Sequence, residues 1–268
     1  MTLTAHEIGQ AAQDLHNAER DRTQIGLLSL RYPGLDMNDA YAIQNALTHL
    51  KLEAGRKVIG WKIGLTSNAM QDALKIDIPD SGMLFDDMLF ENGGTIPEGR
   101  FIQPRVEAEI AFVMKSALGG SKVSRQDVLG ATKCVCPSLE ILDTRIHRAD
   151  PETGKTRKVF DTIADNAANA GLVLGNERHA PGDFDLRWTG AIVSRNGEVE
   201  ETGLGAGVLN DPIESVVWLA RRMADYGQTI EAGQIVLSGS FIRPIECTPG
   251  SQIAADFGPF GAVSCSFN

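Results

Sequence analysis

Two glutamates alternate with apolar residues in one short stretch of this 268-residue chain. Residues 105–113 read RVEAEIAFV, in which Glu107 and Glu109 are separated by a single alanine. This period of two predicts a strand with one apolar face and one face that carries both carboxylates. Alternate strand residues lie about 6.6–7 Å apart along the backbone, so the two carboxylates can lean toward one point. Bringing two anions together costs repulsion unless a cation lies between them.

A third acid has similar surroundings. Glu140 lies within CPSLEILD (136–143), where leucine and isoleucine flank its charge. Three carboxylates without an adjoining histidine suit a hard divalent cation such as Mg²⁺ or Mn²⁺, because these ions prefer oxygen ligands. A solvated sheet face, on which Glu107 and Glu109 pair with arginine or lysine, fits the same spacing. The spacing alone leaves both interpretations open.

Two further residues are candidates for acid–base chemistry. Lys62 lies in VIGWKIGL (58–65), which predicts a strand, and burial there penalises its ammonium group unless an anion is close. Asp80 lies in IPDSG (78–82), which predicts a turn. Each has a structural alternative, since Lys62 can face outward from its strand and Asp80 can serve only to form the turn.

A polar, Pro- and Gly-containing segment at 143–158 is the most basic part of the chain. Such segments between buried strands are often lids or substrate-facing loops, although a solvated loop is the plainer interpretation. The next segment, 160–171, places Asp161, Asp165 and Asn166 among small residues, which indicates tight packing around a polar pocket, although helix capping alone would explain the aspartates. The basic residues of the first segment are Arg145, His147, Arg148, Arg157 and Lys158.

The elements that must position these residues follow from periodicity. Helices are predicted where apolar residues recur every three or four positions: 4–22, 38–54, 69–74, 125–133 and 212–226. Asn38 is the expected N-cap of the second helix, and Gly55 is expected to end it. Residues 1–57 are therefore predicted to form a helical segment that packs on a β-rich core of residues 58–268.

Strands are predicted in the remaining apolar stretches. Asn196-Gly197 is the strongest hairpin signal in the chain, because this pair favours a tight turn between antiparallel strands. A second hairpin is expected at the C-terminus. The predicted strands are 58–65, 83–90, 105–113, 136–143, 172–174, 186–194, 198–201, 234–237, 252–257 and 262–267.

The composition excludes several classes of protein. A net charge of -10 argues against nucleic acid and against an anionic membrane surface, both of which require a basic footprint. Four cysteines are too few and too irregularly spaced for a disulfide framework. No stretch has the apolar length of a signal peptide core or a membrane span, so a cytoplasmic location is expected.

Five motifs occur in the order found in one known family, and they extend over most of the chain. They are GWKIGLTS (60–67), PDSG (79–82), PRVEAE (104–109), LEILD (139–143) and DTIADNAAN (161–169). With them, the chain resembles the hydratase/decarboxylase branch of the fumarylacetoacetate hydrolase superfamily. The resemblance implies an α+β fold, a mixed β-sandwich or barrel-like roll with N-terminal and peripheral helices. It also implies a large homo-oligomer.

The resemblance further implies roles for the candidate residues. Glu107, Glu109 and Glu140 would hold Mg²⁺ or Mn²⁺. Lys62 would donate a proton or a hydrogen bond to the substrate, and Asp80 would orient or deprotonate water. The substrate-binding candidates are Asp161, Asp165, Asn166, Ser240 and Arg148.

The implied reaction is hydration of a 2-oxo-4-enoate or its 2-hydroxy-2,4-dienoate tautomer in aromatic catabolism. Residues 150–161 and 239–244 favour the seven-carbon diacid 2-oxo-hept-4-ene-1,7-dioate of homoprotocatechuate degradation, which would become 4-hydroxy-2-oxoheptanedioate. Its second carboxylate requires a cation, for which Arg145, His147 and Arg148 are the expected group. The alternatives are a 4-oxalocrotonate-type decarboxylase, a 2-oxopent-4-enoate hydratase, an acylpyruvate hydrolase and a non-catalytic partner of a decarboxylase.

Overall fold

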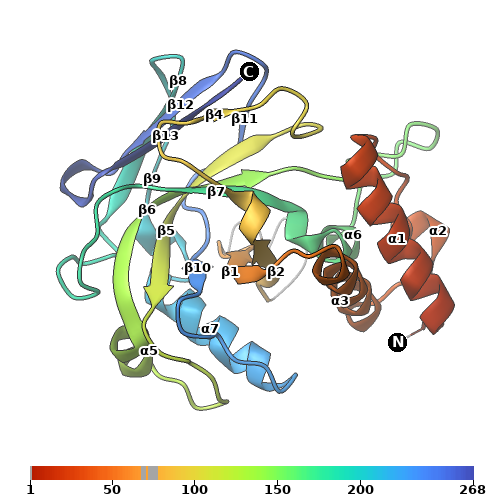
Figure 1. Cartoon of the computed structure of the whole chain (residues 1–268), viewed down its shortest axis with the longest axis horizontal. Coiled ribbons are helices and arrows are strands. Elements are labelled where there is room, and N and C mark those ends of the chain that lie inside the picture. Colours follow the sequence, from red (N-terminus) through yellow and green to blue (C-terminus); the bar gives the residue numbers. More distant parts are fainter. Residues whose placement is uncertain (1, 68–70, 72–77) are drawn as a thin grey trace.

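A computed structural model describes residues 2–67, 71 and 78–268 (Figure 1). The helix expected at 69–74 therefore lies outside the described residues, apart from Gln71. Helices gather at two places around two β-sheets, which confirms the predicted α+β class with N-terminal and peripheral helices. Within the described part of the chain, no helix is long and apolar enough to cross a bilayer.

The N-terminal helices lie together at one side of the molecule (Figure 1). They are α1 Ala5–Asp21, α2 Leu28–Arg31 and α3 Met37–Glu53. The prediction of Asn38 as the N-cap of α3 is wrong, because Asp36 caps the helix by accepting a hydrogen bond from the Asp39 N–H. The sequence prediction also missed α2, which is only four residues long.

The larger sheet has eight strands in the order β2-β1-β10-β5-β6-β7-β3, with β11 paired to β5. The prediction of a turn at 78–82 is wrong from Asp80 onward, because Asp80 begins β2 and pairs with Gly64 of β1. The strands are β1 Val58–Gly64, β2 Asp80–Phe85, β3 Leu89–Phe90, β5 Arg105–Met114, β6 Thr132–Leu142, β7 Asn169–Leu174, β10 Ile235–Leu237 and β11 Ile245–Glu246.

The smaller sheet has five strands in the order β4-β13-β12-β8-β9. Its hairpin across Asn196 and Gly197 is confirmed, and both residues have the positive φ angles, 55° and 86°, that a tight hairpin turn requires. The first hairpin strand begins at Gly190 rather than at 186. The strands are β4 Thr95–Ile96, β8 Gly190–Arg195, β9 Glu198–Leu204, β12 Gln252–Asp256 and β13 Ala262–Phe267.

The remaining helices are peripheral. They are α5 Arg125–Ala131, α6 Val159–Ala164 and α7 Pro212–Ala224, and short 3₁₀ turns occur at η1 Asp86–Met88, η2 Asn166–Ala168, η3 Gly205–Gly207 and η4 Gly258–Phe260. The capped helix after Ser124 and the helix that starts at Pro212 are confirmed. Helices α5 and α7 contact each other beneath the larger sheet (Figure 1).

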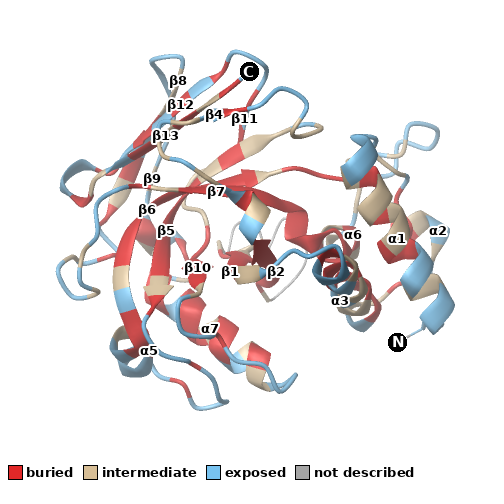
Figure 2. Cartoon of the chain, in the orientation of Figure 1, coloured by how far each residue is buried: buried red, intermediate tan, exposed pale blue. Residues whose placement is uncertain are grey.

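Two hydrophobic cores hold the fold together. The larger core lies along the strands and α7, and Figure 2 shows the strands of the larger sheet as mostly buried. The smaller core joins α1 and α3 to residues from later in the chain, namely Ile146, Ile163 and Ala164. The helical segment is therefore anchored by α6 and its preceding loop. The division at residue 57 stays a prediction.

Candidate active site

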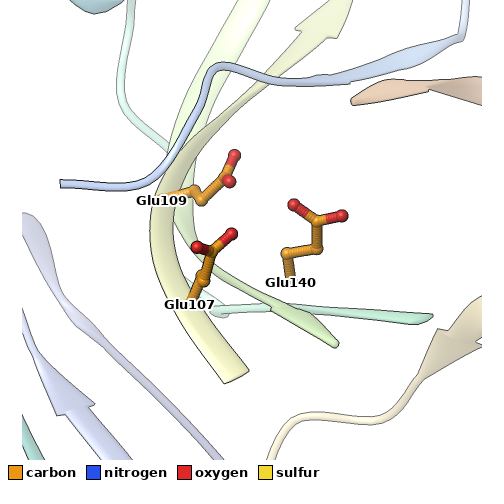
Figure 3. Close-up of side chains that lie close together, drawn as sticks. All are labelled: Glu107, Glu109 and Glu140. Carbon is orange, nitrogen blue, oxygen red and sulfur yellow. The ribbon is translucent and has the colours of Figure 1, made fainter. Parts of the chain in front are cut away.

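The three predicted metal ligands converge because of the register between β5 and β6. Glu107 is paired directly with Glu140 across this antiparallel ladder, and Glu109 lies two residues farther along the same face. One carboxylate oxygen from each residue can be chosen so that all three lie within 4.8 Å of one another. Figure 3 shows the three side chains pointing toward a common space. The prediction of a shared face is confirmed.

Several oxygens of this triad have no hydrogen-bond partner among the described residues. Glu109 Oε2 accepts a hydrogen bond from the Gly239 N–H at 2.8 Å, but Glu109 Oε1 and Glu140 Oε2 accept none, and Glu140 Oε1 has only an ion-pair contact with Lys62. Glu109 and Glu140 are fully buried. Buried carboxylate oxygens without partners are costly, and close oxygen ligands are what Mg²⁺ and Mn²⁺ bind. The triad therefore fits a hard divalent cation.

The electrostatics of the triad point the same way. Burial, followed by repulsion from Glu140, raises the pKa of Glu107 to about 8 and that of Glu109 well above its ordinary value. Burial also raises the pKa of Glu140. A divalent cation would reverse this effect, because it stabilises the charged form of each carboxylate.

Lys62 lies beside the triad on strand β1. Its Nζ is 3.3 Å from Glu140 Oε1 and donates a hydrogen bond to the backbone oxygen of Ala167 at 3.1 Å. Burial alone would lower the Lys62 pKa, but the carboxylates of Glu140 and Asp80 raise it above its ordinary value. Lys62 is thus a buried, protonated donor, and the alternative of an outward-facing lysine is wrong.

Asp80 adjoins Lys62 across the β1–β2 pair. A side chain on Gly64 would collide with both groups, because its Cβ would lie 2.3 Å from Asp80 Oδ1 and 2.9 Å from Lys62 Nζ. Asp80 is buried, and its Oδ1 has no hydrogen-bond partner in the described part of the chain. Burial raises the Asp80 pKa, so this carboxylate is a stronger base than one in water. Gly64 therefore allows an acid and a base to lie side by side.

The Ala167 carbonyl reaches Lys62 through an unusual backbone conformation. Asn166, Ala167 and Ala168 have consecutive positive φ angles of 50°, 52° and 60°. Each non-glycine residue in this region costs roughly 1–2 kcal/mol. The side chain of Asn166 holds the turn in place by accepting from Met83 N at 2.8 Å and donating to Met83 O at 2.9 Å. The sequence prediction missed this turn, since alanine carries no signal for it.

Asp161 and Asp165 lie next to the site but make other contacts. Asp161 accepts from the Ser29 N–H at 2.8 Å, the Ser29 hydroxyl at 2.7 Å and the Lys158 N–H at 2.8 Å. Asp165 forms a buried ion pair with Arg145. These contacts join α2 and the basic loop to α6. The substrate-binding roles of the two aspartates and of Asn166 stay predictions.

Ser240 and Arg148 lie toward the start of β5. The Ser240 hydroxyl hydrogen-bonds with Ile242 and lies 3.5 Å from the backbone oxygen of Ala108, between the two β5 glutamates. Arg148 is 3.3 Å from Glu246, which also binds Arg105 at 2.9 Å. The backbone N–H of Gly239 is a further contact to the triad that the sequence did not predict.

Comparison with known proteins finds relatives that are named as hydratases. No family model matches the chain. It is 50% identical to a 2-oxo-hept-4-ene-1,7-dioate hydratase from Escherichia coli, covering 96% of each chain. It is 40% identical to a 2-keto-4-pentenoate hydratase from Paraburkholderia xenovorans, covering 99% of this chain and 96% of the relative.

Solved structures include both near and distant relatives. A 4-oxalocrotonate decarboxylase from Pseudomonas putida G7, complexed with magnesium and adipate, superposes with a TM-score of 0.93 at 32% identity, covering 100% of this chain and 99% of the other. A fumarylpyruvate hydrolase from Pseudomonas aeruginosa, in complex with Mn²⁺ and pyruvate, has a TM-score of 0.58 at 12% identity, covering 77% and 88%. The second likeness shows the fold alone. Together these structures confirm the predicted fold.

Proposed function

The chain belongs to the hydratase/decarboxylase family of the fumarylacetoacetate hydrolase superfamily, and from this premise we propose that it is a metal-dependent hydro-lyase acting on 2-oxo-4-enoates. One observation carries the proposal: three converging carboxylates with unpartnered oxygens lie beside a buried lysine–aspartate pair. This arrangement combines a cation site with an acid and a base. The acid cluster would have no use in a purely structural subunit, because buried charges without partners destabilise a fold.

The proposed cofactor is Mg²⁺ or Mn²⁺, held by Glu107, Glu109 and Glu140. When bound, such an ion draws electron density from the 2-oxo group of the substrate. A relative with 32% identity has been solved with magnesium. The Gly239 N–H orients Glu109 by binding one of its two oxygens, which leaves the other free for the ion.

The residues of the chain would divide the proton transfers. Lys62, held by Glu140 and the Ala167 carbonyl, would hydrogen-bond to the 2-oxygen of the dienol while the hydroxyl proton leaves this oxygen and a proton is added at C5, which gives the conjugated 2-oxo-3-ene. Asp80 would accept a proton from the water that adds at C4, where conjugation with the 2-oxo group leaves carbon electrophilic, and would return this proton to C3 of the resulting enolate. Burial of both groups keeps bulk water from competing for these protons.

The proposed substrate is the seven-carbon diacid 2-oxo-hept-4-ene-1,7-dioate, which would give 4-hydroxy-2-oxoheptanedioate. The relative that acts on this compound is 50% identical, against 40% for the relative named for 2-keto-4-pentenoate. A 4-oxalocrotonate-type decarboxylase is the second candidate, since a decarboxylase superposes over the whole chain. The acid triad does not distinguish them, because both reactions begin with a 2-oxo acid.

One experiment tests both candidates. Purified protein is incubated with 2-hydroxyhepta-2,4-dienedioate and Mg²⁺, and the product is identified by mass while CO₂ release is measured. We expect a gain of one water, no CO₂, and loss of turnover in EDTA that added Mg²⁺ or Mn²⁺ restores. Full turnover after exhaustive chelation would contradict the metal site. CO₂ release without hydrated product would favour the decarboxylase.

We also propose that the protein is a cytoplasmic homo-oligomer. The smaller sheet supports assembly, because one of its faces carries the exposed apolar residues Ile192 and Leu204, and Trp188 lies just before β8; they are 52%, 45% and 74% exposed. Exposed apolar groups of this size commonly mark an interface. Light scattering would give the subunit number, and Ile192→Arg should lower it. A wild-type monomer would contradict the proposal.

A further inference from the structure

The three arginines of the basic loop 143–158 differ in the ion-pair and hydrogen-bond partners of their guanidinium groups. Arg145 is buried and paired with Asp165, and it also donates to the backbone oxygen of Asn169 at 3.1 Å. Arg148 is paired with Glu246. Arg157 has no ion pair with any described residue, and its NH1 is buried without a hydrogen-bond partner. Arg148 also has a buried nitrogen, Nε, without a hydrogen-bond partner, so what sets Arg157 apart among the described residues of this loop is that it is the arginine without an ion pair.

The backbone fixes the position of Arg157. Its N–H donates to the Arg148 oxygen at 2.8 Å, and the preceding residue, Thr156, forms a bridge with Ala149. The following residue, Lys158, is the N-cap of α6 and donates its N–H to Asp161. The guanidinium is thus presented from an anchored stretch rather than from a free loop end.

The positive charge of Arg157 acts on Asp80 of the acid–base pair and on Arg105 at the start of β5. Its positive charge lowers the pKa of Asp80, against the larger opposing effect of burial. It also repels Arg105, which precedes Glu107 by two residues and thus shares its strand face. The contacts agree with this, because Arg148, whose backbone oxygen binds the Arg157 N–H, shares Glu246 with Arg105; Arg157 therefore belongs to a group of arginines at the start of β5, two residues before Glu107.

Two acids close to Arg157 attract it but form no ion pair or side-chain hydrogen bond with it. Asp161 is hydrogen-bonded to Ser29 and Lys158, and Asp165 is paired with Arg145. Arg157 is half-buried, and its buried NH1 without a partner is costly; arginine binds a carboxylate through two parallel hydrogen bonds. Among the described residues no carboxylate pairs with Arg157, so the carboxylate of a bound molecule can take this place.

We infer that Arg157 binds the second carboxylate of a dicarboxylic 2-oxo acid whose other end occupies the acid triad. This inference rests on the proposed function for the identity of the substrate head group. It replaces Arg148, expected from the sequence, as the specificity-determining cation. Arg148 is less suitable because Glu246 already holds it and its side chain is 37% exposed.

The kinetic test compares the seven-carbon diacid with its five-carbon monoacid analogue in three variants. Arg157→Gln should lower kcat/KM for the diacid roughly 10–100-fold, the effect of losing a hydrogen bond to a charged group, mostly through KM. The monoacid should be turned over as by wild type, which also shows that the variant is folded. Arg157→Lys should keep part of the preference. Lys155→Gln, at an exposed position of the same loop, is the matched control and should change neither substrate.

A binding test separates failure of this inference from failure of the proposed function. The probes are the saturated compounds 2-oxoheptanedioate and 2-oxopentanoate, titrated by calorimetry into protein with Mg²⁺. Arg157→Gln should abolish the preference for the dicarboxylate, whatever reaction the enzyme catalyses. An equal loss for both probes, or a loss of preference in Arg148→Gln but not in Arg157→Gln, would overturn the inference. Absence of hydration with an intact, Arg157-dependent preference would count against the proposed function alone.

Discussion

The helical side of the molecule and the β5–β6 sheet both bury carboxylates, but only one of them neutralises these groups. On the helical side, burial alone would raise the pKa of Glu19, but the Lys51 ammonium, 2.7 Å away, lowers it to about 2. Hydrogen bonds from Thr2, Leu3 and the Asp36 N–H likewise outweigh burial and lower the pKa of Asp39 to about 2.

On the sheet, one lysine faces four acids. Lys62 is the cation that contacts the cluster of Asp80, Glu107, Glu109 and Glu140 within the described residues, and burial raises the pKa of each of these acids. The contrast separates two uses of buried charge. Satisfied carboxylates hold α1, α2 and α3 in place, whereas the unsatisfied cluster, three glutamates of which are drawn in Figure 3, is where the proposed function places the cation and the substrate.

The largest effect is expected from Glu109→Gln. The amide keeps an oxygen for the Gly239 N–H but loses the charge that would bind the cation. Activity should fall by more than the roughly 10–100-fold that loss of an outer-shell partner costs. The melting temperature in EDTA should rise, because one repelling carboxylate is gone. A lower melting temperature in EDTA would mean that Glu109 is structural, as on the helical side.

The next effect is expected from Asp80→Asn. Loss of the base should lower kcat roughly 10²–10⁴-fold, while calorimetry should show metal binding unchanged. Asp39→Asn is the matched control on the helical side. It should leave kcat unchanged and lower the unfolding free energy by roughly 1.5–3 kcal/mol, because its hydrogen bonds involve a charged acceptor. Near-normal turnover by Asp80→Asn would remove it from the mechanism.

Acid should weaken the helical side in a definite pH window. The pKa of Glu19 is about 2 in the folded protein and ordinary in the unfolded chain, so the unfolded chain takes up the proton first as the pH falls. The stabilisation is complete above pH 4.5 and is lost toward pH 2, by roughly 1–3 kcal/mol. Urea unfolding between pH 2 and 6 measures it. Lys51→Met should flatten this dependence; an unchanged slope would assign it to other carboxylates.

The smallest effect is expected from Ser29→Ala. This change removes one hydrogen bond to Asp161 and leaves the bonds from the Ser29 and Lys158 N–H groups. The unfolding free energy should fall by about 1 kcal/mol. Both kcat and KM should stay the same if Asp161 only joins α2 to α6. A changed KM would instead place Asp161 in substrate binding, as the sequence predicted.

Much of this protein follows from local sequence. The alternation around Glu107 predicted its strand, and Asn196-Gly197 predicted its hairpin. The three glutamates left a cation site and a solvated sheet face open, and the family resemblance then implied the cation site. These features depend on neighbours within a few residues, whose side-chain spacing is set by the backbone period. The correspondence between periodicity and structure is closest in those segments.

Only the tertiary structure decided which charges are satisfied. The residues next to Asp80 in the sequence predict a turn. Pairing with Gly64 instead makes Asp80 part of a strand and places it beside Lys62. The left-handed turn at Asn166 and the pairing of Arg145 but not Arg157 are equally invisible in the sequence. Burial and ion pairing depend on residues far apart in the chain, so a charge reveals its role only once its neighbours in space are known.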